Sequence, residues 1–201
     1  MEMIDQIRDR GVADPRVLEA MRQVPRVRFV PPDQAGDAAN DGPLPIGFGQ
    51  TISQPYVVAY MTELLDVSPS HTVLEIGTGS GYQAAILGRL AREVYSVEIV
   101  PALAARAAAV LRELGYANVH VRGGDGFGGW PEHAPFDRIM LTAAPEAIPP
   151  PLLDQLGAGG RLVAPVGPQG AVQWLTVLDK ADESAGARRT IPVRFVPFTR
   201  R

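Results

Sequence analysis

A short apolar run that leads directly into three alternating glycines constrains the fold of this chain more than any other feature. Residues 72–76 form the run, and Gly77, Gly79 and Gly81 follow it before a helical stretch to about Leu90. Glycine is needed where the backbone turns sharply or approaches a ligand closely, and a helix N-terminus favours negative charge. In an open parallel sheet, such a loop lies at the carboxyl end of its strand, where ligands bind. The pattern favours a nucleotide-like ligand, and a tight turn without a ligand is the alternative.

Short apolar runs alternate with helical stretches over most of the chain, which is typical of a parallel sheet buried between helices. The expected strands are 72–76, 94–97, 119–121, 138–141 and 162–166. The expected helices are about 55–65, the stretch that follows the glycines, 102–114, and a short one after Pro149. The predicted fold class is α/β: a doubly wound, mostly parallel Rossmann-like sheet with helices on both faces and an N-terminal helical extension.

The two ends of the chain differ from this pattern. Segments 172–179 and 191–198 read as strands with no helix between them, so we expect an antiparallel pair. At the other end, Asp14-Pro15 supplies a helix N-cap followed by proline at the first helical position. Residues 31–50 hold four prolines and four glycines, which predicts a long ordered loop. We expect a single domain over 1–201, with N-terminal helices and an active-site loop in 1–50 and the α/β core in 51–201.

Composition excludes several kinds of site and partner. The 201 residues include no cysteine, which excludes disulfides, thiolate metal sites and a cysteine nucleophile. The three histidines, His71, His120 and His133, lack ligand spacing, so we expect no metal site. The formal net charge of −3 gives no sign of a nucleic-acid or lipid surface. No run approaches the roughly 18 apolar residues of a membrane span, and the charged first residues do not resemble a secretory leader. We therefore expect a soluble, cytoplasmic protein.

Two acidic residues follow the next strands along the chain. Glu98 ends the strand after the glycine loop, and a carboxylate near that spacing can accept hydrogen bonds from ribose hydroxyls. Asp125 lies between Gly124 and Gly126 at the end of the following strand, where it could bond an exocyclic amine. Taken alone, a solvated Glu98 and a simple turn at Asp125 are the alternative interpretations.

The type of cofactor follows from what the glycine loop has and lacks. No Gly-Lys-Ser/Thr motif is present, so the loop is not a P-loop. A dinucleotide-binding loop would need a small residue where Tyr82 stands. The pattern E-x-G-x-G-x-G, which Glu75 begins, resembles that of S-adenosylmethionine-dependent methyltransferases. The resemblance implies that the loop holds the amino-acid end of the cofactor, Glu98 the ribose and Asp125 the adenine.

A longer stretch carries a more specific resemblance. Residues 45–59, PIGFGQTISQPYVVA, closely resemble the signature segment of the protein-L-isoaspartate (D-aspartate) O-methyltransferase family. The likeness continues in family order through 136–145, 159–167 and 193–199. It implies a methyltransferase sheet and transfer of a methyl group from S-adenosyl-L-methionine to the free α-carboxyl group of L-isoaspartyl, and possibly D-aspartyl, residues in damaged proteins. The ester would then close to a succinimide, which begins repair.

The resemblance also implies roles for individual residues. The implied cofactor-binding residues are Glu75, Gly77, Thr78, Gly79, Gly81, Glu98, Ile99, Asp125, Gly126 and Thr199. The implied substrate-binding residues are Ile52, Ser53, Thr142, Ala143 and Val196, and Ser53 is the expected catalytic residue. The expected partners are proteins and peptides that contain isoaspartyl residues, bound by a monomer. Because the nucleophile is an already ionised carboxylate, we expect no essential general base.

Other interpretations remain open from the sequence. Ser53 could merely cap the helix that begins near Pro55, and Thr142 could be an ordinary strand end. A methyltransferase for a small molecule or RNA would share the glycine loop, Glu98 and Asp125 without needing 45–59. A non-enzymatic cofactor-binding regulator would keep the loop but could lose Ser53, and Tyr82 disfavours a nicotinamide oxidoreductase.

Overall fold

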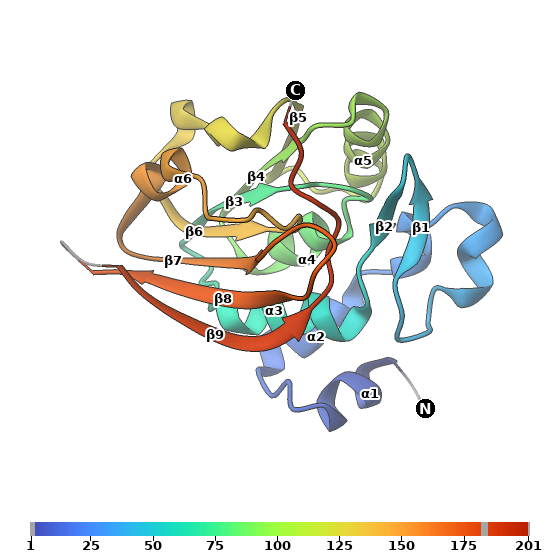
Figure 1. The fold of residues 1–201 in the computed structure, drawn as a ribbon. Coiled ribbons are helices and arrows are strands. Elements are labelled where there is room, and N and C mark those ends of the chain that lie inside the picture. The colour runs from blue at the N-terminus through green and yellow to red at the C-terminus, as the bar shows by residue number, and fades with distance from the viewer. Residues whose placement is uncertain (1–2, 182–184, 201) are drawn as a thin grey trace.

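A mostly parallel sheet forms the centre of the computed structural model, which describes residues 3–181 and 185–200 (Figure 1). Over these residues its strand order is β5-β4-β3-β6-β7-β8-β9. The strands are β3 (Thr72–Ile76), β4 (Glu93–Glu98), β5 (Val119–Gly123), β6 (Phe136–Leu141), β7 (Leu156–Val166), β8 (Gln173–Lys180) and β9 (Ala185–Val193). Strands β3 to β7 pair in parallel, and β8 and β9 add antiparallel to that edge. The predicted doubly wound sheet is confirmed.

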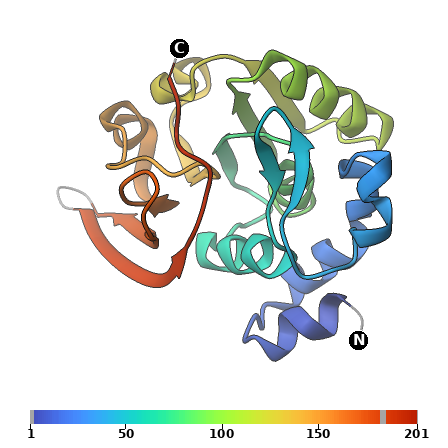
Figure 2. The ribbon, with the colours of Figure 1, turned by 45° about the vertical axis from the view of Figure 1, so that its right-hand side comes forward.

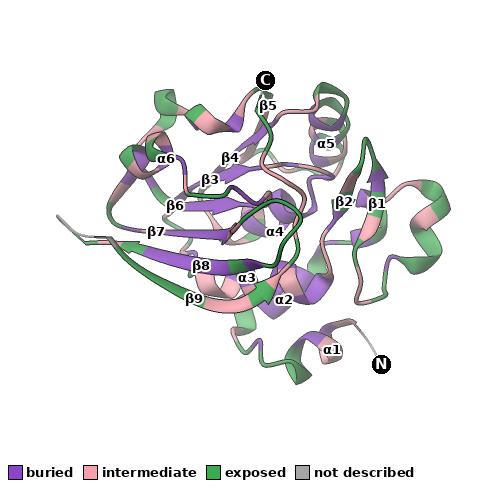
Figure 3. Cartoon of the chain, viewed as in Figure 1, coloured by how far each residue is buried: buried purple, intermediate pink, exposed green. Residues whose placement is uncertain are grey.

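Helices cover both faces of this sheet. On one face, Val73, Met140 and Val163 pack against α3 (Pro55–Leu65) and α4 (Tyr82–Leu90). On the other face, Leu74 and Ile139 pack with α6 (Pro150–Gln155). Because helices cover both faces of the sheet, all five residues of β3 are buried, and its apolar residues Val73, Leu74 and Ile76 do not alternate with exposed ones. Figure 3 shows the central strands β3, β4 and β6 as mainly buried, whereas β9 at the edge of the sheet is intermediate or exposed.

The N-terminal extension packs on the helices rather than on the sheet. Helices α1 (Met3–Asp9) and α2 (Pro15–Gln23) join the cluster that contains α3, α4 and α5 (Pro101–Glu113), and Ile7 and Met21 are fully buried there. The predicted N-cap is confirmed, because the Asp14 side chain accepts a hydrogen bond from the backbone N–H of Arg16 at 2.8 Å. Two 3₁₀-helices follow, η1 (Arg26–Phe29) and η2 (Pro32–Asp37).

The prediction of a long ordered loop over 31–50 was wrong in part, because this stretch contains regular secondary structure. Besides η2, this stretch contributes β1 (Leu44–Gly47), which pairs with β2 (Gln50–Ile52) in an antiparallel hairpin. Its turn has positive φ at Gly47, Phe48 and Gly49, at 90°, 56° and 70°. The flanking glycines permit this turn, and Pro45 is tolerated because each strand of a two-stranded hairpin has a free edge.

The C-terminal pair is antiparallel as predicted, but its second strand is displaced. β9 begins at Ala185, six residues before the expected 191, and ends at Val193. Just after the strand, the Phe195 N–H donates a hydrogen bond to the Gln173 side chain at 2.9 Å. Residues 194–200 then cross the carboxyl edge of the sheet, opposite the hairpin, as Figures 1 and 2 show. Hydrogen bonds on either side of the Ala144–Pro197 bridge hold this C-terminal segment: the Ala144 N–H donates to the Val196 carbonyl at 2.9 Å and the Phe198 N–H to the Ala144 carbonyl at 3.0 Å.

No helix among the described residues combines the length and apolarity needed to cross a bilayer.

Candidate active site

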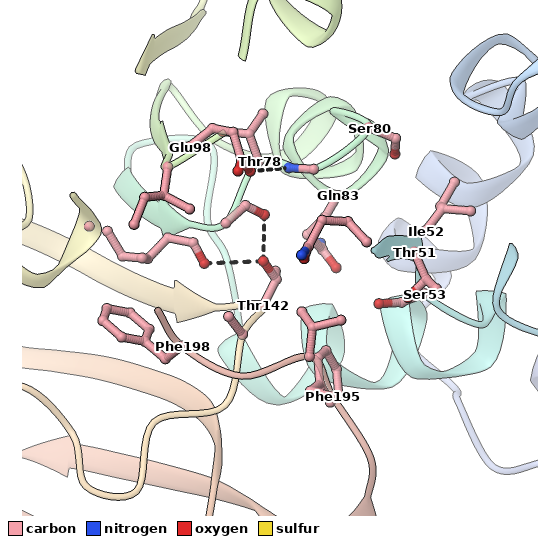
Figure 4. A pocket seen from close by; sticks show the side chains of 18 of the residues that line it. Thr51, Ile52, Ser53, Thr78, Ser80, Gln83, Glu98, Thr142, Phe195 and Phe198 are labelled. Atoms are coloured by element: carbon pink, nitrogen blue, oxygen red, sulfur yellow. Dashed lines mark hydrogen bonds between the residues drawn. The ribbon is translucent and has the colours of Figure 1, made fainter. Parts of the chain in front are cut away.

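A pocket lies where β3, β4 and β6 end, between the hairpin and the C-terminal segment (Figure 4). In this view Glu98 and Thr78 lie on one side, Ser53 and Thr51 on the other, and Thr142 between them. Most of the predicted site residues line it: Ile52, Ser53, Gly77, Thr78, Gly79, Glu98, Ile99, Gly126, Thr142, Ala143, Val196 and Thr199. Glu75, Gly81 and Asp125 lie outside its lining. The pocket therefore joins segments from residue 50 to residue 199.

The glycine loop has the backbone geometry that its sequence predicts. Gly77, Gly79 and Gly81 have φ of 103°, 53° and 89°, in the left-handed region that side chains disfavour. A Cβ on Gly77 would lie 2.3 Å from the Thr142 hydroxyl, which donates hydrogen bonds to the carbonyls of Gly77 and Ile76. Thr142 thus fixes the loop from the end of β6. At the end of the loop, the N-terminus of α4 offers backbone N–H groups that favour negative charge.

Glu98 connects the loop to β4. Its carboxylate accepts hydrogen bonds from the N–H groups of Gly79 at 2.7 Å and Val100 at 2.9 Å, and only 5% of the residue is exposed. An ionised carboxylate has about four acceptor positions. Glu98 therefore retains acceptor capacity toward the pocket, which suits ribose hydroxyls.

Glu75 lies beneath the loop and is completely buried. Ser96 donates a hydrogen bond to its Oε2 and also contacts the Thr78 hydroxyl, whereas Oε1 has no partner among the described residues. Burial raises the pKa of Glu75 to about 8, which the Ser96 hydrogen bond opposes and the charge of Glu98 increases. Glu75 therefore reaches the pocket only through Ser96 and Thr78, as a mainly protonated group at neutral pH.

Both carboxylate oxygens of Asp125 accept hydrogen bonds from other residues of the chain. Its Oδ1 accepts from the N–H of Phe127 at 2.9 Å and begins the 3₁₀-helix η3 (Gly126–Gly128), and its Oδ2 accepts from Arg200 at 3.3 Å. Gly126 does line the pocket, and a Cβ there would lie 2.3 Å from Ile76 Cγ2. The absence of a side chain at 126 lets η3 pack against the end of β3.

Ser53 lies at the boundary between the pocket and a neighbouring groove of about 440 Å³. Thr51, Ser53, Thr142, Phe195 and Val196 line both cavities, so the two hydroxyls that were expected to bind substrate lie where the cavities meet. Arg10 and Arg194 line the groove, and its described lining includes no carboxylate.

The structure does not support a purely capping role for Ser53. The N-cap of α3 is Gln54, which makes no side-chain capping bond. Instead Asp41, from the loop before the hairpin, accepts a hydrogen bond from the Tyr56 N–H at 3.0 Å. Helix α3 is thus capped by a distant residue.

Ser80, Gln83, Phe195 and Phe198 are among the lining residues that sequence reasoning did not assign to the site. Gln83 is only 7% exposed in the first turn of α4, and it donates a hydrogen bond to the Thr62 hydroxyl at 2.9 Å. A polar residue two positions after Gly81 in an otherwise apolar helix start was the available signal. The two phenylalanines fall inside the 193–199 segment that had been singled out.

Among the described residues, no three His, Asp or Glu side chains gather as a metal site would require.

Comparison with known proteins yields one family. The family model described as protein-L-isoaspartate(D-aspartate) O-methyltransferase matches residues 1–201. A protein-L-isoaspartate O-methyltransferase of Gloeobacter violaceus is 58% identical over 199 residues, with 98% of this chain and 97% of the relative covered. One from Anaeromyxobacter dehalogenans is 57% identical over 200 residues, covering 98% and 96%.

Solved structures agree with the sequence matches. A protein-L-isoaspartate O-methyltransferase structure superposes with a TM-score of 0.88 at 28% identity, and covers 97% of this chain and 64% of that one. A Plasmodium falciparum structure, described as a protein-L-isoaspartate O-methyltransferase in complex with S-adenosyl-L-homocysteine, has a TM-score of 0.86 at 22% identity. It covers 99% of this chain and 97% of its own, and supports the fold.

Proposed function

Because the chain belongs to the protein-L-isoaspartate(D-aspartate) O-methyltransferase family, it methylates isoaspartyl residues with S-adenosylmethionine, and we propose that the pocket and groove described above carry out this transfer. The acceptor is the free α-carboxyl group of the isoaspartyl residue, and the products are its methyl ester and S-adenosylhomocysteine. The ester closes to a succinimide, whose hydrolysis returns some normal aspartyl.

The pocket fits the cofactor on its own geometry. Gly77 and Gly79 line the pocket with backbone in the left-handed region, and the start of α4 favours the anionic carboxylate of the methionine part. Glu98 accepts from ribose hydroxyls, and Ile76, Ile99 and Gly126 line the same pocket, where a flat ring could pack against them. When bound, S-adenosylmethionine supplies an electrophilic methyl group on a positively charged sulfur.

Ser53 orients the acceptor, and Thr142 lines the boundary beside it. A peptide in the groove would place its isoaspartyl carboxylate at the boundary that both hydroxyls line. The carboxylate is ionised at neutral pH, because its reference pKa is about 3.3–3.9. The Ser53 hydroxyl therefore holds the nucleophile in line without removing a proton, while the Thr142 hydroxyl stays bonded to the carbonyls of Gly77 and Ile76. Positioning of this kind supplies several kcal/mol, up to about 7–11 in well-oriented systems.

The single observation that carries this proposal is the position of Ser53 and Thr142 at the boundary between the pocket that contains the glycine loop and Glu98 and the groove that contains Arg10 and Arg194. The test is incubation with radiolabelled S-adenosylmethionine and paired peptides that differ only in aspartyl or isoaspartyl linkage. We expect label on the isoaspartyl peptide alone. Equal labelling of both peptides, or of neither, would contradict the proposal, and a D-aspartyl peptide defines the breadth of the substrate class.

The match over 1–201 includes the 45–59 segment, which a small-molecule or RNA methyltransferase would not need. We propose that 1–201 act as one domain, because α1, α2 and the hairpin bury Ile7, Met21 and Ile46 against the core. We also propose that the enzyme works as a cytoplasmic monomer without a nucleic-acid partner. Light scattering coupled to size-exclusion chromatography tests its oligomeric state.

A further inference from the structure

Arg26 is a buried arginine that bonds to backbone carbonyls alone. Only 4% of the residue is exposed, although it belongs to the short helix η1. Its Nη1 donates to the carbonyls of Ala38 at 2.8 Å and Asn40 at 3.4 Å. Its Nη2 donates to the carbonyls of Gly42 at 2.9 Å and Ser53 at 3.1 Å. One guanidinium therefore joins the loop before the hairpin to the residue where the pocket and groove meet.

No carboxylate neutralises this guanidinium within ion-pair distance among the described residues. The nearest acid of the loop, Asp41, instead accepts from Arg10 at 2.7 Å and from Gln54 and Tyr56. Burial lowers the pKa of the Arg26 guanidinium, and Tyr82 and Asp41 oppose this effect. A buried charge without an ionic partner is expensive, and apolar packing would usually give more stability.

The contacts of Arg26 and Asp41 converge on one short stretch of backbone. Arg26 holds the carbonyl of Ser53, while Asp41 holds the Gln54 side chain at 2.8 Å and the Tyr56 N–H at 3.0 Å. Within the part of the chain that the structure describes, no hydrogen bond holds the Ser53 hydroxyl. Its position toward the substrate therefore depends on how firmly the Ser53 backbone is held.

We infer that Arg26 is a positioning residue for methyl transfer, which acts by fixing the Ser53 carbonyl and through it the Ser53 hydroxyl. The inference rests on the proposed function of Ser53. It assigns a chemical role to η1, a part of the chain in which the sequence shows no functional motif. Arg26 touches neither cavity, because the lining of the pocket and of the groove omits it.

The test is a double-mutant cycle between Arg26→Lys and Ser53→Ala, with steady-state kinetics on an isoaspartyl peptide. Lysine keeps the charge but cannot reach four carbonyls from one planar group. We expect R26K to lower kcat about tenfold or more, because small displacements of a positioning group are costly. Binding of S-adenosylhomocysteine, measured by calorimetry, should stay close to wild type. In the S53A background the same substitution should have little further effect on kcat.

The matched control is Arg161→Lys. Arg161 donates to the Leu64 carbonyl at 3.1 Å, at the opposite end of α3 from Ser53. The Arg161→Lys substitution should change the melting temperature about as much as R26K does, but it should leave kcat near the wild-type value.

An equal loss of kcat from R26K with and without Ser53 would overturn the inference, because Arg26 would then act on the fold in general. If R26K does not fold, Arg26→Gln, which keeps a donor without the charge, enters the same cycle. Failure of both variants to fold would also overturn a positioning role. A wild-type enzyme without isoaspartyl activity would refute the proposed function instead, so the two failures are distinguishable.

Discussion

Glu98 is the residue on which cofactor affinity is expected to depend most. Glu98→Ala removes charge-assisted hydrogen bonds to the ribose, which should weaken S-adenosylmethionine binding by about 1.5–3 kcal/mol, or roughly ten- to a hundredfold. Calorimetry with the cofactor measures this change. Glu93→Ala, at the other end of the same strand, is the control. Equal affinity of the two folded variants would contradict the ribose assignment.

Ser53→Ala should separate catalysis from stability. Because Asp41 rather than Ser53 bonds the first turn of α3, the melting temperature should hardly change. Turnover of an isoaspartyl peptide should fall by more than cofactor affinity does, because the lost hydroxyl orients the acceptor. Ser70→Ala is the comparison, since Ser70 is exposed, contacts Ser68 and lies outside both cavities, so it should leave kcat close to wild type. A lower melting temperature with normal turnover would favour a structural role for Ser53.

Glu75 should make stability depend on pH. The folded state raises the pKa of Glu75 from 4.5 to about 8, so the native protein holds a proton that the unfolded chain has released between these values. Stability from this group is therefore complete below about pH 4.5 and is lost as pH rises toward 8, by at most about 1.4 kcal/mol per pH unit. Glu75→Gln, which stays neutral, should flatten the profile of unfolding free energy from denaturant titrations between pH 5 and 8. Identical slopes for both proteins would contradict a protonated Glu75.

At the scale of secondary-structure elements, the distant cap of α3 makes a prediction. Asp41→Ala removes the acceptor for the Tyr56 N–H and should destabilise the protein by about 1–2 kcal/mol, the range of helix N-caps. Asp37→Ala, in the same loop, loses only a local bond to Asn40 and should cost much less. Chemical denaturation measures both, and equal losses would show that Asp41 acts on the loop rather than on the helix.

The elements that sequence reasoning found are those whose signal is local. A parallel strand such as β3 is apolar on both faces, and the turn after it requires glycine, so both are visible in a short window. β9 is an edge strand that contains Arg188 and Arg189 and pairs only with β8. Its backbone hydrogen bonds do not require apolar side chains, so its first half shows no apolar run in the sequence. The hairpin was missed because the four prolines and four glycines of 31–50 predicted a loop.

The residues of the site also divide into those that a local sequence motif predicts and those that only the packing of the chain brings to the pocket. Glu98, Ser53 and Thr142 follow motifs, whereas Gln83 and Phe195 reach the pocket only through the packing of α4 and the C-terminal segment. The role inferred for Arg26 depends on how the loop at 38–42 folds around it.

At the scale of the whole molecule, the groove differs in charge from the protein around it. The chain carries a net charge of −3, yet the described lining of the groove holds two arginines and no acid. Arg10 is paired with Asp41 at 2.7 Å, whereas Arg194 is exposed and makes no ion pair among the described residues. Arg194 is therefore the main source of positive potential along the groove.

An isoaspartyl peptide with a flanking glutamate should thus have a higher kcat/KM than one with lysine. The difference should shrink at high salt, because the Debye length falls from about 10 Å at 0.1 M to about 3 Å at 1 M. Arg194→Gln should remove most of it, and Arg188→Gln, on β9 outside the groove, should not. A preference that survives Arg194→Gln would place the selectivity elsewhere.

The place of the C-terminal segment in the sequence determines when, during synthesis, the cofactor pocket is complete. The glycine loop and Glu98 leave the ribosome about a hundred residues before Phe195 to Thr199, which supply a wall of the same pocket. A nascent chain that has already formed β3, β4 and α4 still lacks this wall and the hydrogen bonds that the segment makes with Ala144. Tight cofactor capture must therefore wait until Phe195 to Thr199 have been synthesised and have emerged, so a ribosome-bound chain stalled before that point should fold its central strands and still fail to retain the product S-adenosylhomocysteine.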